Sequence, residues 1–68
     1  MNWDIVKGNW MQLKGEARKQ WGKLTDDDWD VIAGDRDKLS GKLQVHYGWA
    51  KDEVEKHIDG FFTERAAK

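Results

Sequence analysis

The apolar side chains of this chain recur at helical spacing. In the first third, the residues three or four positions apart are Trp3, Val6, Trp10, Leu13, Ala17 and Trp21. In the middle third, the same spacing joins Trp29, Ile32, Arg36, Leu39, Leu43 and Tyr47. Such spacing places each set on one face of a helix, whereas a strand would show strict alternation. Proline is absent. The pattern therefore predicts an all-α protein.

The two stretches are copies of one unit, offset by 26 residues. This offset superposes three pairs of glycines: Gly8 on Gly34, Gly15 on Gly41, and Gly22 on Gly48. Arg36 takes the place of Trp10, and there its stem can lie along the edge of the core while its charged head stays in water. The pseudo-repeat predicts two helical hairpins packed across each other.

Four main helices are expected, near residues 9–21, 26–33, 35–47 and 50–64, after a short turn at 3–7. Gly8-Asn9 and Gly34-Asp35 each resemble a C′ glycine followed by an N-cap. We expect a break at Gly34, where the flanking charge is high, and fraying near Gly8. One long helix per copy is the alternative.

The start of the second helix is marked by Thr25, a good N-cap residue. The helix dipole favours the negative charges that follow it, Asp26, Asp27 and Asp28. Thr25 and Asp28 resemble a capping box with Asp in place of Glu. We therefore interpret these acidic residues as local helix-start charges.

The last helix is expected to bury one face made of Ala50, Val54, His57, Ile58, Phe61 and Arg65. Residues 66–68 are expected to fray. A chain of 68 residues forms one domain at most, with an ordered core expected over about 3–64. Because there is no cysteine, no disulfide reinforces this small core.

No arrangement of residues predicts catalysis, a metal or a cofactor. Asp26, Asp28 and Asp30 have the spacing that begins a calcium loop, but Val31 stands where the sharp turn requires Gly. His46 and His57 could bind zinc only with carboxylates that the spacing does not suggest. A nucleophilic triad and a Gly-rich phosphate loop are also absent from the sequence. The sequence therefore predicts a protein that is not an enzyme.

Six residues are candidates for a partner surface. Trp49 follows Gly48 and has no partner in a helical stripe, so we expect it to be partly exposed. Gly15 and Gly41 lie away from the apolar stripes, where a bare backbone lets a partner approach closely; tolerance of weak helices is the simpler explanation. The basic residues expected on one side of the first helix are Lys7, Lys14 and Arg18.

Overall charge indicates no particular partner. The net charge is −1, with a basic excess over residues 1–23 and an acidic excess over 24–37. Basic residues interleaved with five Trp could bind single-stranded nucleic acid, but the Trp spacing favours core positions and a neutral pI disfavours a dedicated nucleic-acid binder. No apolar run is long enough to span a membrane. We expect a cytoplasmic monomer with, at most, an unknown protein partner.

The most specific sequence blocks are Gly8-Asn9-Trp10, Leu13-Lys14-Gly15, the run from Trp21 to Asp28, and Leu39-Ser40-Gly41-Lys42 with Tyr47-Gly48. Together they resemble the CsbD-like family of small bacterial general stress-response proteins, from about Asn2 to Phe62. The resemblance implies a small, soluble, cytoplasmic, all-helical protein induced under stress, with no established catalytic activity and no functional residue to carry over. The tail Phe61-Phe62-Thr63-Glu64-Arg65 departs most from the family pattern.

Three functions remain open. The first is a stress-induced binding or adaptor module. The second is a hydrophilic protectant acting by abundance, in keeping with 7 Gly and a mean hydropathy of −0.95. The third is weak nucleic-acid binding through the basic first helix.

Overall fold

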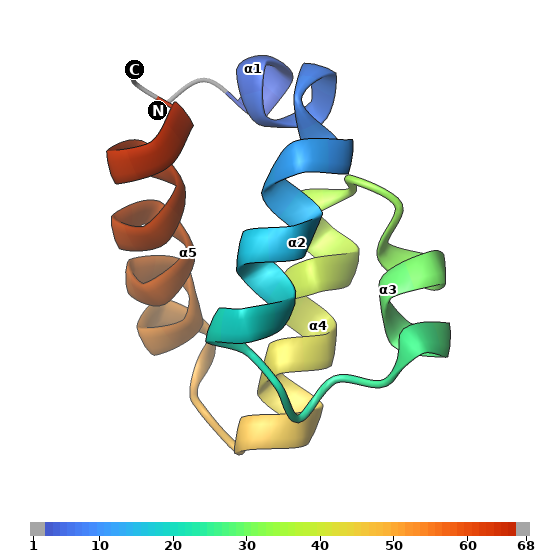
Figure 1. The fold of residues 1–68 in the computed structure, drawn as a ribbon. Helices are drawn as coiled ribbons and strands as arrows, with labels where there is room; N and C mark the ends of the chain where they lie inside the picture. The colour runs from blue at the N-terminus through green and yellow to red at the C-terminus, as the bar shows by residue number, and fades with distance from the viewer. Residues whose placement is uncertain (1–2, 67–68) are drawn as a thin grey trace.

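The computed structural model describes residues 3–66, with side chains described through Glu64. This part of the chain is helical and contains no strand (Figure 1). The five helices are α1 (Trp3–Gly8), α2 (Trp10–Gln20), α3 (Asp26–Ile32), α4 (Arg36–Tyr47) and α5 (Lys51–Ala66). The all-α class is confirmed, and α2 to α5 lie close to the four expected ranges. The segment expected to be a short turn at 3–7 is a helix, α1.

The helices pack into a body of 30 × 24 × 18 Å. Contacts join α4 to both α3 and α5, and α1 to both α2 and α5. In Figure 1, α3 and α5 lie on either side of the molecule and α2 lies in front of α4. These contacts do not confirm two hairpins packed across each other, because α3 contacts α4 rather than pairing mainly with α2.

Both predicted apolar stripes reach the core. In the first stripe, every member from Val6 to Trp21 is buried and Trp3 is half-buried. In the second stripe, Arg36 and Tyr47 are half-buried and the other members are buried. The side chains that form one continuous core across the helices include Trp10, Leu13, Ala17, Trp21, Trp29, Ile32, Leu39 and Leu43. The spacing of apolar residues therefore predicted most of this core correctly.

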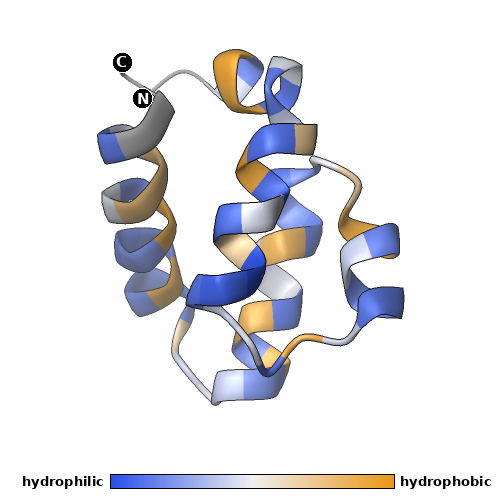
Figure 2. Ribbon diagram, viewed as in Figure 1, coloured by the Kyte–Doolittle hydropathy of each residue, from blue (hydrophilic) through white to orange (hydrophobic). Residues whose placement is uncertain are grey.

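The buried face of α5 differs from the expected one. Val54, Ile58 and Phe61 are buried as predicted, but His57 and Ala50 are exposed, and Phe62 is fully buried. Ala50 precedes the helix, and the face centred between Ile58 and Phe62 turns toward the core. Figure 2 shows these hydrophobic bands of α5 on the side turned toward the other helices. The expectations for the Arg65 side chain and for residues 67–68 lie outside the described part.

The chain breaks at Gly34, as expected. Ala33 and Gly34 have positive φ angles of 43° and 86°, and Asp35 then caps α4 by accepting the Lys38 N–H at 3.2 Å. This break excludes one long helix through the second copy.

The interpretation of Gly8-Asn9 as a C′ glycine followed by an N-cap is wrong, although the helical run is interrupted at Asn9, beside the position where fraying is expected. Gly8 lies inside α1 without a positive φ, and Asn9, between α1 and α2, makes no side-chain cap. The Asn9 side chain donates instead to the Ile5 carbonyl, at 3.0 Å. The chain is therefore interrupted here by a local kink between two helices rather than by a left-handed turn.

Candidate functional site

The first turn of α3 is held by a reciprocal capping box. The Thr25 hydroxyl accepts the Asp28 N–H at 3.2 Å, and the Asp28 carboxylate accepts the Thr25 N–H at 2.9 Å. Two backbone donors that the helix itself cannot satisfy thus find acceptors. The capping box predicted from the sequence is confirmed, with Asp28 at the position that Glu more often occupies.

Asp28 also links α3 to α4, which the sequence did not suggest. Its carboxylate is largely buried and lies 3.1 Å from the Lys42 ammonium and 2.8 Å from His46 Nε2. The hydrogen bond from the Thr25 backbone N–H, reinforced by Lys42, holds the pKa of Asp28 well below its ordinary value of 3.8, although burial raises it. Asp28 is therefore an anion shared by two helices, and the interpretation of all three aspartates as purely local charges is wrong for this residue.

The acidic residues at the start of α3 point to separate partners. Asp26 forms an ion pair with Arg18 of α2, whereas Asp28 faces α4. Within the described residues, no three His, Asp or Glu side chains gather closely enough to hold a metal ion. Asp26 and Asp28 thus each join α3 to another helix, and the purely local interpretation is wrong for Asp26 as well.

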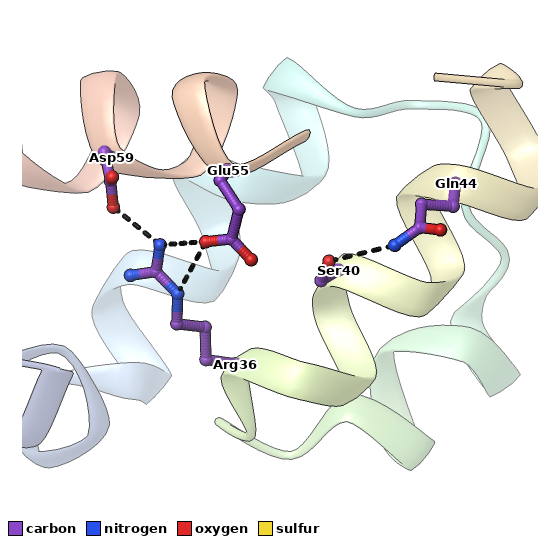
Figure 3. Close-up of polar contacts among 5 residues, drawn as sticks. All are labelled: Arg36, Ser40, Gln44, Glu55 and Asp59. Carbon is purple, nitrogen blue, oxygen red and sulfur yellow. Dashed lines mark hydrogen bonds and ion pairs between the residues drawn. The ribbon is translucent and has the colours of Figure 1, made fainter. Parts of the chain in front are cut away.

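Arg36 is bound by α5 rather than free in water. Its guanidinium donates to Glu55 through Nε at 3.2 Å and through a second, shorter bond, and to Asp59 at 2.6 Å (Figure 3). It also lies 5.6 Å from the centre of the Trp3 ring, and its side chain is only 26% exposed. Burial lowers the pKa of Arg36, but the hydrogen bonds that the guanidinium donates to both carboxylates outweigh this effect and raise the pKa. The prediction that the Arg36 guanidinium stays in water is therefore wrong.

Figure 3 also shows a polar contact within α4. Gln44 donates to the Ser40 hydroxyl one turn earlier, at 3.3 Å. Ser40 is buried and is the only serine in the chain. Its hydroxyl is thus engaged in a contact within one helix.

Trp49 is half-buried, and both faces of its ring are covered. Tyr47 stacks on one side with ring centres 4.5 Å apart, and His57 on the other at 4.0 Å. The Lys23 ammonium lies 5.0 Å from the Tyr47 ring centre and extends the stack. Trp49 therefore fastens the α4–α5 connection to α5. The sequence missed this partner because Trp49 and His57 meet across a turn, outside any helical spacing.

The expected basic side of the first helix is divided in the structure. Lys7 belongs to α1, and its stem lies against Gly34, whereas Lys14 and Arg18 belong to α2. Lys14 is half-buried, and Arg18 is paired with Asp26. The interruption at Asn9 is the reason, since it gives Lys7 a separate helix.

Gly15 and Gly41 lie on open outer surfaces. A Cβ added to either would meet no atom within 4 Å. Each has an exposed apolar neighbour one turn away on its own helix: Met11, 81% exposed, beside Gly15, and Val45, 78% exposed, beside Gly41. We call Met11, Gly15, Arg18 and Lys19 the α2 surface, and Asp37, Lys38, Gly41 and Val45 the α4 surface.

The chain has clear relatives among bacterial proteins. The sequence profile of CsbD-like proteins matches residues 4–56. A UPF0337 protein of Rhodopseudomonas palustris is 60% identical over 63 residues, covering 93% of this chain and 96% of the relative. The UPF0337 protein YjbJ of Escherichia coli is 54% identical over 61 residues, covering 90% and 88%. A UPF0337 protein of Pseudomonas aeruginosa is 46% identical over 61 residues, covering 90% and 94%.

No helix within residues 3–66 has the length and apolar character needed to cross a membrane. The family profile covers most of the chain, and the relatives match over nearly their whole length. The matched range of this chain, 4–56, spans the positions of its capping box, of its break at Gly34 and of Gly15 and Gly41. This chain belongs to the CsbD-like family.

Proposed function

We propose that this protein is a non-enzymatic, cytoplasmic stress-response protein of bacteria that works as a binding module. Its α2 surface docks a segment of a partner protein that carries acidic and apolar side chains. The observation that carries the proposal is the pairing of exposed Met11 with the bare backbone of Gly15.

Gly15 does not serve the packing of its own chain. A glycine inside a helix costs about 1 kcal/mol relative to Ala. The space above Gly15 is empty, so an Ala methyl would fit there without a clash. A close approach by another molecule gives this residue a use that the fold itself does not supply.

The neighbours of Gly15 define the chemistry of the partner. Met11 is flexible and polarisable, a property that suits side chains at adaptable binding surfaces. Lys19 is exposed on the same side of α2, and Arg18 is close by, where Asp26 already holds it. An acidic segment with one or two apolar residues fits such a surface. Trp49 is left out because both faces of its ring are covered.

A protectant acting by abundance is the second candidate. It is supported by a charged fraction of 37% and a mean hydropathy of −0.95. Nucleic-acid binding has less support, because Lys7 is on a separate helix and Arg18 is paired. A protectant needs no particular surface, whereas a binding module does, and this difference allows a test.

The test places a photo-crosslinking residue at position 11 in stressed bacteria and, as a control, at position 31 on α3. A binding module gives discrete crosslinked products at position 11 that Gly15→Ala weakens, although this change stabilises the fold. Purified wild type and Gly15→Ala are also compared for protection of an enzyme during drying. Equal protection by both, with no discrete product at position 11, would favour the protectant.

A further inference from the structure

The side chains most open to oxidation lie in two different environments, and the sulfur of Met11 is the exposed one. The chain has no cysteine and two methionines, of which Met1 lies outside the described residues. Met11 is 81% exposed, the largest fraction among the exposed large hydrophobic residues of the described part. A small oxidant in solution can therefore reach this thioether.

The indole rings are covered by comparison. Trp10, Trp21 and Trp29 are buried in the core. Trp49 is half-buried, and other rings cover both of its faces. Trp3 is also half-buried and packs edge-to-face against an aromatic ring of the core. An oxidant therefore meets the Met11 sulfur before it meets an indole.

The position of Met11 confines the effect of oxidation to the surface of α2. Methionine sulfoxide is polar and disrupts a protein when it forms in a core. Met11 does not belong to the core of this chain, although its neighbour Trp10 does. The space above Gly15, one turn later, is open, and Lys19 is exposed on the same side. An added oxygen thus has room and changes the polarity of the α2 surface without disturbing the packing.

We infer that Met11 is a site of reversible oxidation to methionine sulfoxide, where a peroxide alters the α2 surface and leaves the fold intact. The sulfur lone pair attacks one oxygen of hydrogen peroxide, the O–O bond breaks and an S–O bond forms. The proton of the transferred hydroxyl joins the departing oxygen, which leaves as water. Sulfur loses two electrons, and the peroxide gains them.

The reverse step needs access to the sulfoxide, which the exposure of Met11 provides. Methionine sulfoxide reductases act on the two sulfoxide epimers, one enzyme for each. Two thiols supply the two electrons and become a disulfide, and the sulfoxide oxygen leaves as water. Oxidation at this position is therefore reversible.

The consequence for partner docking rests on the proposed function. A sulfoxide oxygen must lose its bound water to enter the apolar contact beside Gly15, which costs free energy unless a donor replaces that water. An acidic segment offers carboxylates, which accept hydrogen bonds and do not donate them when ionised. Oxidation of Met11 should therefore weaken docking about tenfold or more.

The first measurement treats the purified full chain with hydrogen peroxide and locates the added oxygen by mass spectrometry of its peptides. Met11 is expected to gain one oxygen while the tryptophans stay unmodified. The melting temperature should change by less than about 4 °C, as for other surface changes. Both reductases with a thiol should remove the oxygen. Tryptophan oxidation as fast as that of Met11, or loss of the fold on oxidation, overturns the inference.

The second measurement places a photo-crosslinking residue at position 12, an exposed position next to Met11, in stressed bacteria before and after peroxide treatment. Discrete products of the otherwise wild-type chain should fall about tenfold after treatment. Met11→Leu keeps an apolar side chain and retains Met1, so it is the matched control, and its products should not change.

The outcomes separate this inference from the proposed function. If the untreated chain gives no discrete product, the proposed function fails and the docking consequence fails with it, whereas the mass measurement still decides whether Met11 is the oxidation site. Products that persist after Met11 is oxidised overturn the inference alone. So does an equal loss of products from Met11→Leu, because that loss cannot come from the Met11 sulfur.

Discussion

Gly8-Asn9 and Gly34-Asp35 occupy the same position in the sequence repeat but have different structures. Gly34 adopts a left-handed φ of 86°, and Asp35 caps the next helix through the Lys38 N–H. Gly8 is the last residue of α1 and has no positive φ, and the Asn9 side chain does not cap α2. Similar local sequence therefore produced a helix break in one copy and a kink in the other.

The difference follows from tertiary contacts that only one of the two turns has. The Trp3 indole donates to the Gly34 carbonyl at 2.7 Å. The Trp10 side chain lies 3.5 Å from the position of a Gly34 Cβ, whereas no atom lies within 4 Å of that position at Gly8. The α3–α4 turn is thus held against α1 and α2. A glycine followed by a capping residue permits a break, and packing decides whether it forms.

The largest expected effect comes from the repeat position that Trp10 and Arg36 share. Trp10 is buried against Trp29 and Phe62, so Trp10→Ala should cost about 3–5 kcal/mol, comparable with the stability of so small a domain. Arg36→Ala loses a partly exposed ion-pair network and a contact with Trp3, and should cost about 1–2 kcal/mol. Urea denaturation measures both. Equal costs would mean that the two copies are structurally equivalent here.

The two glycines should respond to Ala with opposite signs. Gly34→Ala forces a side chain into the left-handed region and should destabilise the fold by roughly 1–2 kcal/mol. Gly8→Ala lies in a helix with open space around it and should stabilise by up to about 1 kcal/mol. Thermal melts of the two variants against wild type provide the measurement. A stabilising Gly34→Ala would show that the turn tolerates another conformation.

Replacing Thr25 and Asn9 by Ala should affect stability differently, because the Thr25 side chain caps a helix and the Asn9 side chain does not cap α2. Thr25→Ala loses one half of the α3 capping box and should cost about 0.5–2 kcal/mol. Asn9→Ala should change the free energy of unfolding by less than about 0.5 kcal/mol, since its side chain makes no cap. Circular dichroism melts of both variants test this. A cost at Asn9 matching that at Thr25 would contradict the kinked arrangement.

The last comparison concerns how the stability depends on pH at Asp28 and at its neighbour Asp27. Because folding lowers the pKa of Asp28, its ionised form contributes stability above about pH 4 that is lost as the pH falls below the ordinary value of 3.8. Asp28→Asn should therefore flatten the acid side of the stability profile, and Asp27→Asn, one position earlier in the same first turn, is the matched control. Urea midpoints from about pH 7 to about pH 2 reveal the slopes. Identical profiles for wild type and Asp28→Asn would disprove this role of Asp28.

Sequence reasoning worked where a feature depends on residues within a few positions. The Thr25 cap and the apolar stripes are of this kind, because helical geometry relates residues three and four apart in a fixed way. It failed for Phe62 and His57, since the rotation of α5 about its axis depends on what the helix meets. For Trp49 the partial exposure was predicted correctly, but its stacking on His57 was not, because that partner lies across a turn.

For the candidate site, the sequence singled out Gly15 and Gly41 but not the exposed Met11 and Val45 beside them. An apolar residue off the main stripe has no local signature of exposure, because another helix could have covered it. The same limit applied to Lys7, Lys14 and Arg18, whose common side depended on an uninterrupted helix.

The sequence by itself determined the all-α class and the capped starts of α3 and α4, because propensity, capping and apolar period act over one or two turns. The tertiary structure alone decided which helices touch and which charges are shared. Two groups of ion pairs join residues far apart in sequence. Asp28 pairs with Lys42 and His46, and Arg36 pairs with Glu55 and Asp59. The physical reason is that such contacts depend on how whole helices settle on a common core, and no local pattern encodes that arrangement.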